Sequence, residues 1–255
     1  MHTSYEQRLE FLHQFLDGSE AFHAKLPNAK VIKGDGWELT AGDSRFPMFN
    51  PVLIQTSRKE AVDEVIAAIA SNQHPSDIRL VGPGINHIGA LAEHGYSNLG
   101  GTPFMLWSAD SSVDAFTLRD GLSARRLVPD DLPTMNAIYA DVYGMGPDMI
   151  ADMQRMLFVS THDYTWGLFK DDEMVSLVTA MIFNDTIGIW SMGTPTAHQK
   201  NGYGLQLLKH VMKTHKDTGA KNFFLFASAA GKFLYDKCAW TTLDYLPYLS
   251  KVSKD

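Results

Sequence analysis

The chain has 255 residues, of which 45% are hydrophobic and 20% charged, and this balance excludes disordered, collagenous and coiled-coil classes. Its 22 basic and 29 acidic side chains give a net charge of −7, which argues against nucleic acid as a partner because nucleic-acid binding needs a basic face. The single cysteine, Cys238, excludes an internal disulfide framework and a cysteine-based zinc cluster.

The first half of the chain has the pattern of alternating helices and strands. Apolar residues at spacings near three and four predict an amphipathic helix over 4–24. Further elements are then predicted in this order: strands at 37–40 and 51–56, a helix at 58–70 with Ser57 as its N-cap, a strand at 80–81, a helix at 85–94 and a strand at 102–107. The polar stretch 110–114 ends the series. We therefore predict a first domain over residues 1–112.

The second half of the chain predicts a larger set of elements. They are a strand at 122–128, helices at 129–143 and 147–158, strands at 165–170, 174–184 and 186–194, a helix at 202–218, a strand at 222–228, a helix at 230–238 and a last strand within 240–252. Short acidic turns join the three central strands, which is typical of an antiparallel meander. The pattern predicts a mixed α+β domain over 113–255, with a mostly antiparallel central sheet and flanking helices.

The two halves contain similar segments. Leu91, Tyr96 and the pair Pro103-Phe104 recur in the same order as Leu234, Trp240 and the pair Pro247-Tyr248, with one residue inserted. Short apolar patterns recur by chance, but these two lie in similar strand and helix contexts. The repetition therefore favours two related domains in tandem.

The sharpest local motif is Gln199-Lys200-Asn201-Gly202-Tyr203-Gly204, between an apolar strand and an amphipathic helix. Unpaired backbone amides at a helix start, together with the helix dipole, form a site for an anion. Gly202 and Gly204 let the backbone approach a ligand without an intervening Cβ. The motif lacks the Gly-Lys-Ser/Thr of a Walker loop and the third glycine of a dinucleotide fingerprint. It predicts a phosphate site, and the alternative is a tight turn that only starts the helix.

A second motif follows at Ser228–Trp240, and the two together resemble the GNAT superfamily of acyl-CoA-dependent N-acyltransferases. The first motif resembles the family's Gln/Arg-x-x-Gly-x-Gly/Ala loop. The second resembles its Asn-x-x-Ala-x-x-Leu-Tyr-x-Lys-x-Gly-Phe helix, with Leu234, Tyr235 and Lys237 retained and Ser228 in place of Asn. The resemblance covers residues 121–252. It implies a tandem GNAT-like fold whose catalytic domain is 113–255 and whose first domain, 1–112, is a degenerate copy without a pyrophosphate loop.

The resemblance also implies a site for acetyl-CoA as co-substrate. The strand at 186–194 is expected to splay from the strand at 222–228 and to leave room for the thioester. The residues implied in acetyl-CoA binding are Met192 and Thr194 for the pantetheine arm, Gln199, Lys200, Asn201, Gly202, Tyr203 and Gly204 for the pyrophosphate, and Ser228 for a hydroxyl contact to the pantetheine.

The catalytic residue that the resemblance implies is Tyr235, as the general acid that protonates the departing thiolate; the alternative is a packed aromatic side chain. Some family members use a strand glutamate as the base, but the matching position here is Gly188. Asp185, Ser191 and His198 are the polar candidates near that strand, and the sequence does not choose among them.

The acceptor site is expected beside this strand, with Trp190 and Tyr143 as substrate-binding residues. Residues 1–120 carry 9 basic and 15 acidic side chains, a balance that favours a cationic amine. Cys238 could suggest a covalent acyl-enzyme, but it lies near a predicted helix C-terminus, where the dipole disfavours a thiolate. A packed thiol is the preferred interpretation.

The function predicted is N-acetyl transfer from acetyl-CoA to a primary amine of a small molecule, by direct attack in a ternary complex. The alternative is a non-catalytic acyl-CoA-binding or interaction module. The ten histidines show no metal-ligand spacing, so no metal is expected. The polar N-terminus and the short longest apolar run, 65–70, predict a cytoplasmic protein without a membrane partner, as a monomer or homodimer.

Overall fold

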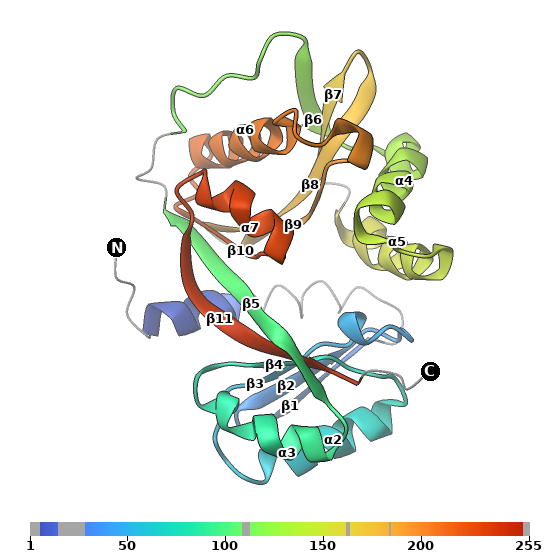
Figure 1. Ribbon diagram of the computed structural model, residues 1–255, viewed down its shortest axis with the longest axis vertical. Helices are drawn as coiled ribbons and strands as arrows, with labels where there is room; N and C mark the ends of the chain where they lie inside the picture. The colour runs from blue at the N-terminus through green and yellow to red at the C-terminus, as the bar shows by residue number, and fades with distance from the viewer. Residues whose placement is uncertain (1–5, 15–28, 109–112, 162–163, 184, 252–255) are drawn as a thin grey trace. The chain divides into compact units, whose positions relative to one another are not determined.

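The computed structural model describes residues 6–14, 29–108, 113–161, 164–183 and 185–251. The chain divides into two compact units, which are drawn together in Figure 1 and are considered one at a time. Unit 1 comprises Met1–Phe15 and Phe104–Leu243, and unit 2 comprises Leu16–Pro103 and Asp244–Asp255. The division after Pro103 precedes the predicted boundary at 112. Of the predicted helix over 4–24, residues 6–14 are helical and the rest lie outside the described residues.

Unit 2 is a mixed sheet with two helices. Its elements are β1 Lys30–Gly34, β2 Trp37–Ala41, β3 Val52–Ile54, α2 Ala61–Asn72, β4 Ile78–Leu80, α3 Ile88–Glu93, the first part of β5 Ser97–Ser108 and most of β11 Thr241–Ser250. The strand order is β1-β2-β3-β4-β11-β5. Strands β3 and β4 run parallel, so α2 is the helix of a crossover connection between them. Strand β1 is absent from the sequence prediction because its exposed, lysine-flanked segment lacks a buried face.

The helix α2 begins later than the sequence predicts. Its N-cap is Glu60, without a side-chain capping bond, so the prediction that Ser57 caps the helix is wrong. The intervening residues form a turn in which the Ala61 N–H donates to the Arg58 carbonyl oxygen at 3.1 Å. The Arg58 guanidinium makes two bonds to the Glu64 carboxylate, at 2.9 and 2.6 Å. This pair fixes the start of the helix.

Unit 1 likewise consists of parallel and antiparallel strands flanked by helices. Its elements are the end of β5, then β6 Leu122–Arg126, α4 Leu132–Tyr143, α5 Pro147–Thr161, β7 Thr165–Lys170, β8 Glu173–Phe183, β9 Thr186–Gly193, α6 Tyr203–Asp217, β10 Asn222–Phe226 and α7 Ala229–Asp236. The strand order is β5-β10-β9-β8-β7-β6, and only the β9–β10 pair among these described strands is parallel. The prediction of a mixed α+β fold with a mostly antiparallel sheet is confirmed.

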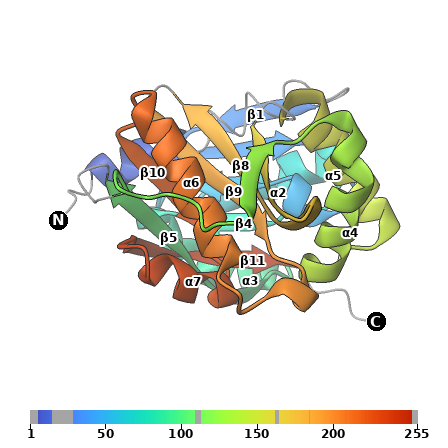
Figure 2. The ribbon, with the colours of Figure 1, turned by 90° about the horizontal axis from the view of Figure 1, so that it is seen from above.

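The core of unit 1 forms where α6 packs on β7, β8 and β9, and Figure 2 shows this helix lying over the strands. The apolar face of α6 provides Leu207, Leu208, Val211 and Met212, all fully buried. Alternate residues of the strands face it, as Ile187 and Ile189 do on β9. The packing fixes the end of β9 and the start of α6 relative to each other.

Backbone pairing explains why the boundary between the units differs from the prediction. Residues 104–108 of β5 pair antiparallel with β10, so they belong to the sheet of unit 1. Residues 248–249 of β11 pair with β4 and belong to unit 2. The last strand of each half therefore contributes to the other half's unit.

None of the helices in the described part of the chain has the length and apolar character of a membrane span.

Candidate active site

Strand β9 changes course at its C-terminal end. Its parallel ladder with β10 ends at the pair Ile189 and Leu225. On its other edge, the register with β8 slips between Trp190 and Gly193, where β9 carries one extra residue. Ser191 in this bulge has a φ of +47°. Strand β9 thus continues past its ladder with β10 through this bulge.

The loop after β9 is held mainly by its own side chains and by one carboxylate from α4. The Asp141 carboxylate accepts from the Thr196 N–H at 2.6 Å and from its hydroxyl at 3.1 Å. The Gln199 side-chain amide donates to the Thr194 carbonyl oxygen at 3.3 Å. The Asn201 amide donates to the carbonyl oxygens of residues 198 and 199, at 3.1 and 3.2 Å. These contacts hold the loop without using the backbone N–H groups of 200–202.

Those N–H groups, and the N–H groups of the first three residues of α6, have no hydrogen-bond partner within the described residues. Within the described residues, the backbone N–H groups of 200–202 donate no hydrogen bond. The N-cap of α6 is Gly202, with a φ of +77° and no side-chain cap, and the first turn contains no acidic residue. The first N–H groups of a helix have no partner within the helix, and the dipole makes this end positive. These N–H groups are therefore free to donate to an anion.

The glycines of the loop differ in their surroundings. A Cβ on Gly204 would lie 3.1 Å from Met192 Cε, 3.2 Å from Thr194 Oγ1 and 3.3 Å from Leu234 Cδ1. A Cβ on Gly202 would meet no atom within 4 Å. Gly204 thus allows α6, the end of β9 and α7 to pack closely, whereas Gly202 faces open space.

Tyr235 on α7 places a buried phenol against the end of β9. Its side chain is 7% exposed, and its hydroxyl donates to Met192 Sδ at 3.6 Å. Burial raises the pKa of Tyr235 above its usual value, so the phenol keeps its proton at neutral pH. A thioether is a weak acceptor, and Tyr235 makes no other side-chain hydrogen bond within the described residues. The hydroxyl can therefore turn to a stronger acceptor, such as a thiolate, at little cost.

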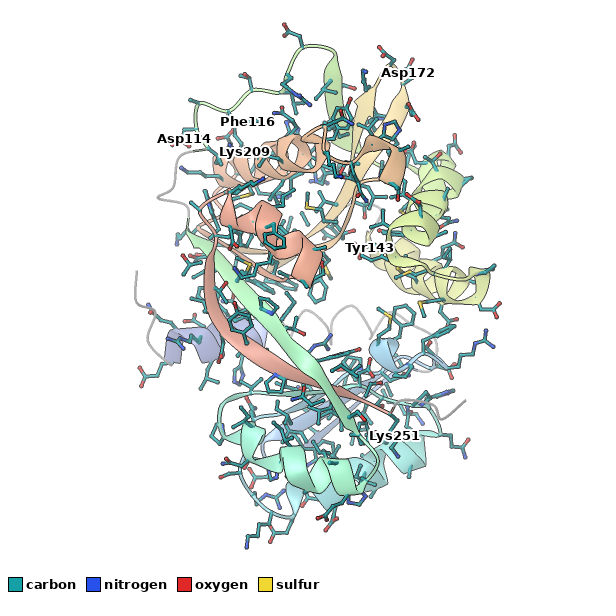
Figure 3. All side chains as sticks on the ribbon, viewed as in Figure 1. Asp114, Phe116, Tyr143, Asp172, Lys209 and Lys251 are labelled. Carbon is teal, nitrogen blue, oxygen red and sulfur yellow. The ribbon has the colours of Figure 1, made fainter. Side chains whose placement is uncertain are left out.

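Tyr143, labelled in Figure 3, contacts the same methionine from α4. Its hydroxyl donates to the Met192 carbonyl oxygen at 2.6 Å. Desolvation raises the pKa of Tyr143, and the nearby phenols of Tyr139 and Tyr235 add to this effect. Met192 is thus contacted by two phenols, one at its carbonyl and one at its sulfur. Its carbonyl is already engaged before any pantetheine arm binds.

The position of the family's strand glutamate is closed to a carboxylate. A Cβ on Gly188 would lie 2.7 Å from Trp190 Nε1 and 3.0 Å from both Phe183 Cε2 and Phe224 Cζ. Three aromatic rings fill the space that a longer side chain needs. The structure therefore gives a steric reason for glycine at this position.

The three candidate bases lie in different places. Asp185 precedes β9 at its opposite end, and its ion pair with Lys221 at 2.9 Å lowers its pKa. His198 pairs with Glu173 at 2.9 Å in the loop. Ser191 occupies the bulge of β9, next to Trp190. Asp185 is thus separated from the bulge by the length of the strand, and none of the three candidates makes a hydrogen bond to Tyr235 within the described residues.

Two further predicted residues have local roles. Ser228 is the N-cap of α7, and its hydroxyl oxygen accepts from the Gly231 N–H at 3.0 Å, which leaves the hydroxyl proton for another acceptor. Cys238 is 8% exposed, its thiol lies 3.4 Å from the Leu234 carbonyl oxygen, and burial raises its pKa to about 11. Such a thiol is not a nucleophile at neutral pH. Among the described residues, no group of three His, Cys, Asp or Glu side chains could hold a metal ion.

The structure brings most of the predicted site together. Met192, Thr194, Gly204 and Tyr235 meet at the end of β9, with Tyr143 beside them. The side chains of Gln199 and Asn201 turn back onto the loop, and the Gln199 N–H donates to the Thr196 carbonyl oxygen at 3.4 Å. The Asn201 N–H is therefore available to a ligand, whereas the Gln199 N–H is already used. The sequence analysis missed Asp141 and Arg119, which brace the loop from distant segments; no motif marks either one.

Comparison with known families identifies the class of domain to which the fold and the open loop belong. Residues 133–239 match the sequence profile of the Acetyltransferase (GNAT) family. The matched range begins in α4 and ends after α7, so it contains β9, the loop and Tyr235. The chain therefore contains a GNAT acetyltransferase domain, which supports acyl transfer as the class of reaction. No curated protein sequence matches the chain.

Solved structures extend the fold comparison to nearly the whole chain. A GCN5-related N-acetyltransferase from Kribbella flavida has a TM-score of 0.70 at 15% identity, over 93% of this chain and 95% of that one. One from Sphaerobacter thermophilus has a TM-score of 0.62 at 14% identity, over 84% and 76%. A functionally unknown conserved protein from Staphylococcus epidermidis has a TM-score of 0.66 at 13% identity, over 89% and 95%. At these identities the likeness shows the fold alone.

Proposed function

We propose that the protein is an N-acetyltransferase that moves an acetyl group from acetyl-CoA to a primary amine of a small molecule. The observation that carries this proposal is the buried Tyr235 hydroxyl on Met192 at the end of β9, beside an uncapped helix start. The helix start suits the pyrophosphate and the phenol suits a departing thiolate. The GNAT profile match covers both features.

The proposed binding mode follows the open donors. Backbone N–H groups from Lys200 to Gly204 hold the pyrophosphate, since the Gln199 N–H already donates to the Thr196 carbonyl oxygen at 3.4 Å. The backbones of Met192 and Thr194 and the Ser228 hydroxyl contact the pantetheine arm. The bond from Tyr143 to the Met192 carbonyl leaves only one acceptor lone pair at that position. A pantetheine amide that uses this carbonyl therefore shares it with Tyr143 or displaces it.

The proposed reaction is direct attack in a ternary complex. The amine nitrogen forms a bond to the thioester carbonyl carbon, the carbon–sulfur bond breaks, and the Tyr235 phenol donates its proton to the thiolate. The amine loses its proton to solvent or to a basic group of the acceptor molecule itself. The aromatic rings around Gly188 leave no room for the strand carboxylate that some family members use as the base. The protonated, buried Cys238 thiol argues against an acyl-enzyme.

The acceptor site is proposed beside the bulge, with Trp190 and Tyr143 as its contacts. The acidic balance of residues 1–120 favours a cationic amine. We also propose that residues 1–112 are a degenerate GNAT-like copy. The crossover β3–α2–β4, which has the same parallel form as β9–α6–β10, supports this relation.

The test is the Tyr235→Phe variant, assayed for free thiol release with acetyl-CoA and a panel of primary amines. We expect kcat to fall by about 100- to 10,000-fold, because the phenol acts mainly as charge develops on sulfur, with little change in the Kd of CoA measured by calorimetry. Tyr245→Phe is the control, since Tyr245 is 54% exposed.

An unchanged kcat would make Tyr235 a packed aromatic residue only. The aromatic filling around Gly188 favours a second candidate function, a non-catalytic acyl-CoA-binding module. That candidate predicts that the unmodified protein binds CoA and releases no thiol with any amine of the panel.

A further inference from the structure

A segment of unit 1 runs along the whole length of α6 before β6 begins. The Asp114 carboxylate pairs with Lys216 Nζ at 2.8 Å near the end of the helix, and the Phe116 ring lies 6.0 Å from Lys209 Nζ at its middle. Figure 3 shows Asp114, Phe116 and Lys209 close together beside α6. The segment 113–121 therefore runs antiparallel to the helix and ends at its N-terminus.

At that N-terminus, Arg119 is held by three contacts. Its backbone N–H donates to Gln206 Oε1 at 3.1 Å. Its guanidinium carbon lies 5.5 Å from the centroid of the Tyr203 ring, and Nη2 donates to the Asn201 carbonyl oxygen at 2.9 Å. Tyr203 is the first residue of α6 and Asn201 belongs to the open loop. An exposed cation is thus fixed at the proposed phosphate site.

The contact of Arg119 with the Asn201 carbonyl fixes the direction of the neighbouring Gly202 N–H. The Asn201 carbonyl belongs to the same peptide unit as the Gly202 N–H. In a planar trans peptide, the C=O and N–H groups point in opposite directions. Arg119 therefore holds the carbonyl from behind while the N–H of Gly202 points away from it. Donation to a carbonyl also polarises its peptide and strengthens the N–H as a donor.

We propose that Arg119 is a positioning residue for a phosphate-bearing ligand, acting through the Asn201–Gly202 peptide to orient and polarise the Gly202 N–H. The proposal rests on the proposed function, which assigns this N–H to the pyrophosphate of acetyl-CoA. It adds that part of the positive charge of the site comes from a segment outside the loop and the helix. The expected specificity is for ligands with phosphate over the bare pantetheine arm.

The test compares Arg119→Gln and Arg119→Lys in the full chain. Glutamine keeps an N–H donor and loses the charge, whereas lysine keeps the charge. The ligands are CoA, measured by calorimetry at two salt concentrations, and pantetheine, measured by ligand-observed NMR. Arg125→Gln is the control for loss of an exposed arginine elsewhere in unit 1. Arg125 lies 4.2 Å from the Phe169 ring centroid and donates to the Arg126 carbonyl oxygen at 3.1 Å, and it also pairs with the Asp131 carboxylate at 2.7 and 2.8 Å.

We expect Arg119→Gln to weaken CoA binding by about five- to tenfold and to reduce its salt dependence, with pantetheine binding unchanged and partial recovery in Arg119→Lys. CoA binding within twofold of the unmodified protein overturns the proposal. An equal loss for CoA and pantetheine also overturns it, because the residue would then only support the fold. If the unmodified protein binds no CoA, the proposed function fails as well.

Discussion

The two parallel crossovers among the described strands begin their helices in opposite ways. In unit 2, α2 follows β3 and has Asp63 and Glu64 in its first turn. In unit 1, α6 follows β9 and has no acid there, and its N-cap is a glycine in the left-handed region. Carboxylates near a helix N-terminus stabilise the helix and repel a phosphate. The helix α2 thus satisfies its own dipole, whereas α6 leaves that end to a ligand.

The difference shows that a crossover connection alone does not make a binding site. The Arg58–Glu64 pair and the Trp37 indole N–H, which donates to Glu64 at 2.8 Å, occupy the carboxylate at the start of α2. The Asn201 side chain and Arg119 hold the loop before α6 through carbonyl oxygens. The polar groups at the start of α2 bind one another, whereas the start of α6 leaves its N–H groups available to a ligand.

Among the substitutions that test this comparison, Gly202→Val is expected to have the largest effect, on the affinity for CoA. A β-branched residue at φ +77° costs about 1–2 kcal/mol in the left-handed region, so the loop relaxes toward another conformation and the amides lose their common direction. We expect CoA affinity by calorimetry to fall at least about tenfold.

The matched control for this variant is Gly219→Val at the other end of α6. Gly219 has a φ of +106°, and a Cβ there also meets no atom within 4 Å. It should lose stability by a similar amount and keep the affinity for CoA. Equal affinities for CoA in the two variants would show that the loop is not part of the binding site.

A smaller effect is expected from Lys200→Glu, which adds an acid to the loop and makes the start of α6 more like that of α2. The exposed side chain interacts with a bound phosphate through solvent, so CoA affinity should fall about three- to tenfold at low salt and recover as salt screens the charge. Lys59→Glu, next to the start of α2, should leave the affinity unchanged. A loss that persists at high salt would contradict this electrostatic account.

The smallest effect concerns the stability of unit 2. Hydrogen bonds from Arg58 and Trp37 lower the pKa of Glu64 from 4.5 to about 2. A depressed folded-state pKa contributes stability that is present above the unfolded value and lost as the pH falls through the folded value. Glu64→Gln should therefore unfold at lower denaturant than the unmodified protein at pH 7. The difference between the denaturant midpoints of the two proteins should narrow as the pH falls from 4.5 to 2.

Denaturant midpoints across this pH range, followed by Trp fluorescence, test the prediction. CoA affinity of Glu64→Gln should stay unchanged. A gap that is constant with pH would mean that Glu64 acts through packing and not through its charge.

The sequence by itself determined the elements of unit 1 and the local features of the site. Apolar periodicity placed β7, β8, β9 and α6 to within a residue or two, because one face of each must be buried. The glycines at 202 and 204 and the Leu234-Tyr235 pair predicted the loop and the helix as parts of a site only through their resemblance to the motifs of a known family. The steric reason for glycine at 188, however, needed the positions of three aromatic rings.

Only the tertiary structure decided which backbones pair and which distant residues reach the loop. The end of β5 joins the sheet of unit 1 and the end of β11 that of unit 2, because strand ladders are made by backbone groups that every residue shares. Likewise, Asp141 and Arg119 carry no signature in the sequence. Their contacts at 2.6 and 2.9 Å exist because α4 and the segment 113–121 fold back onto the loop after β9.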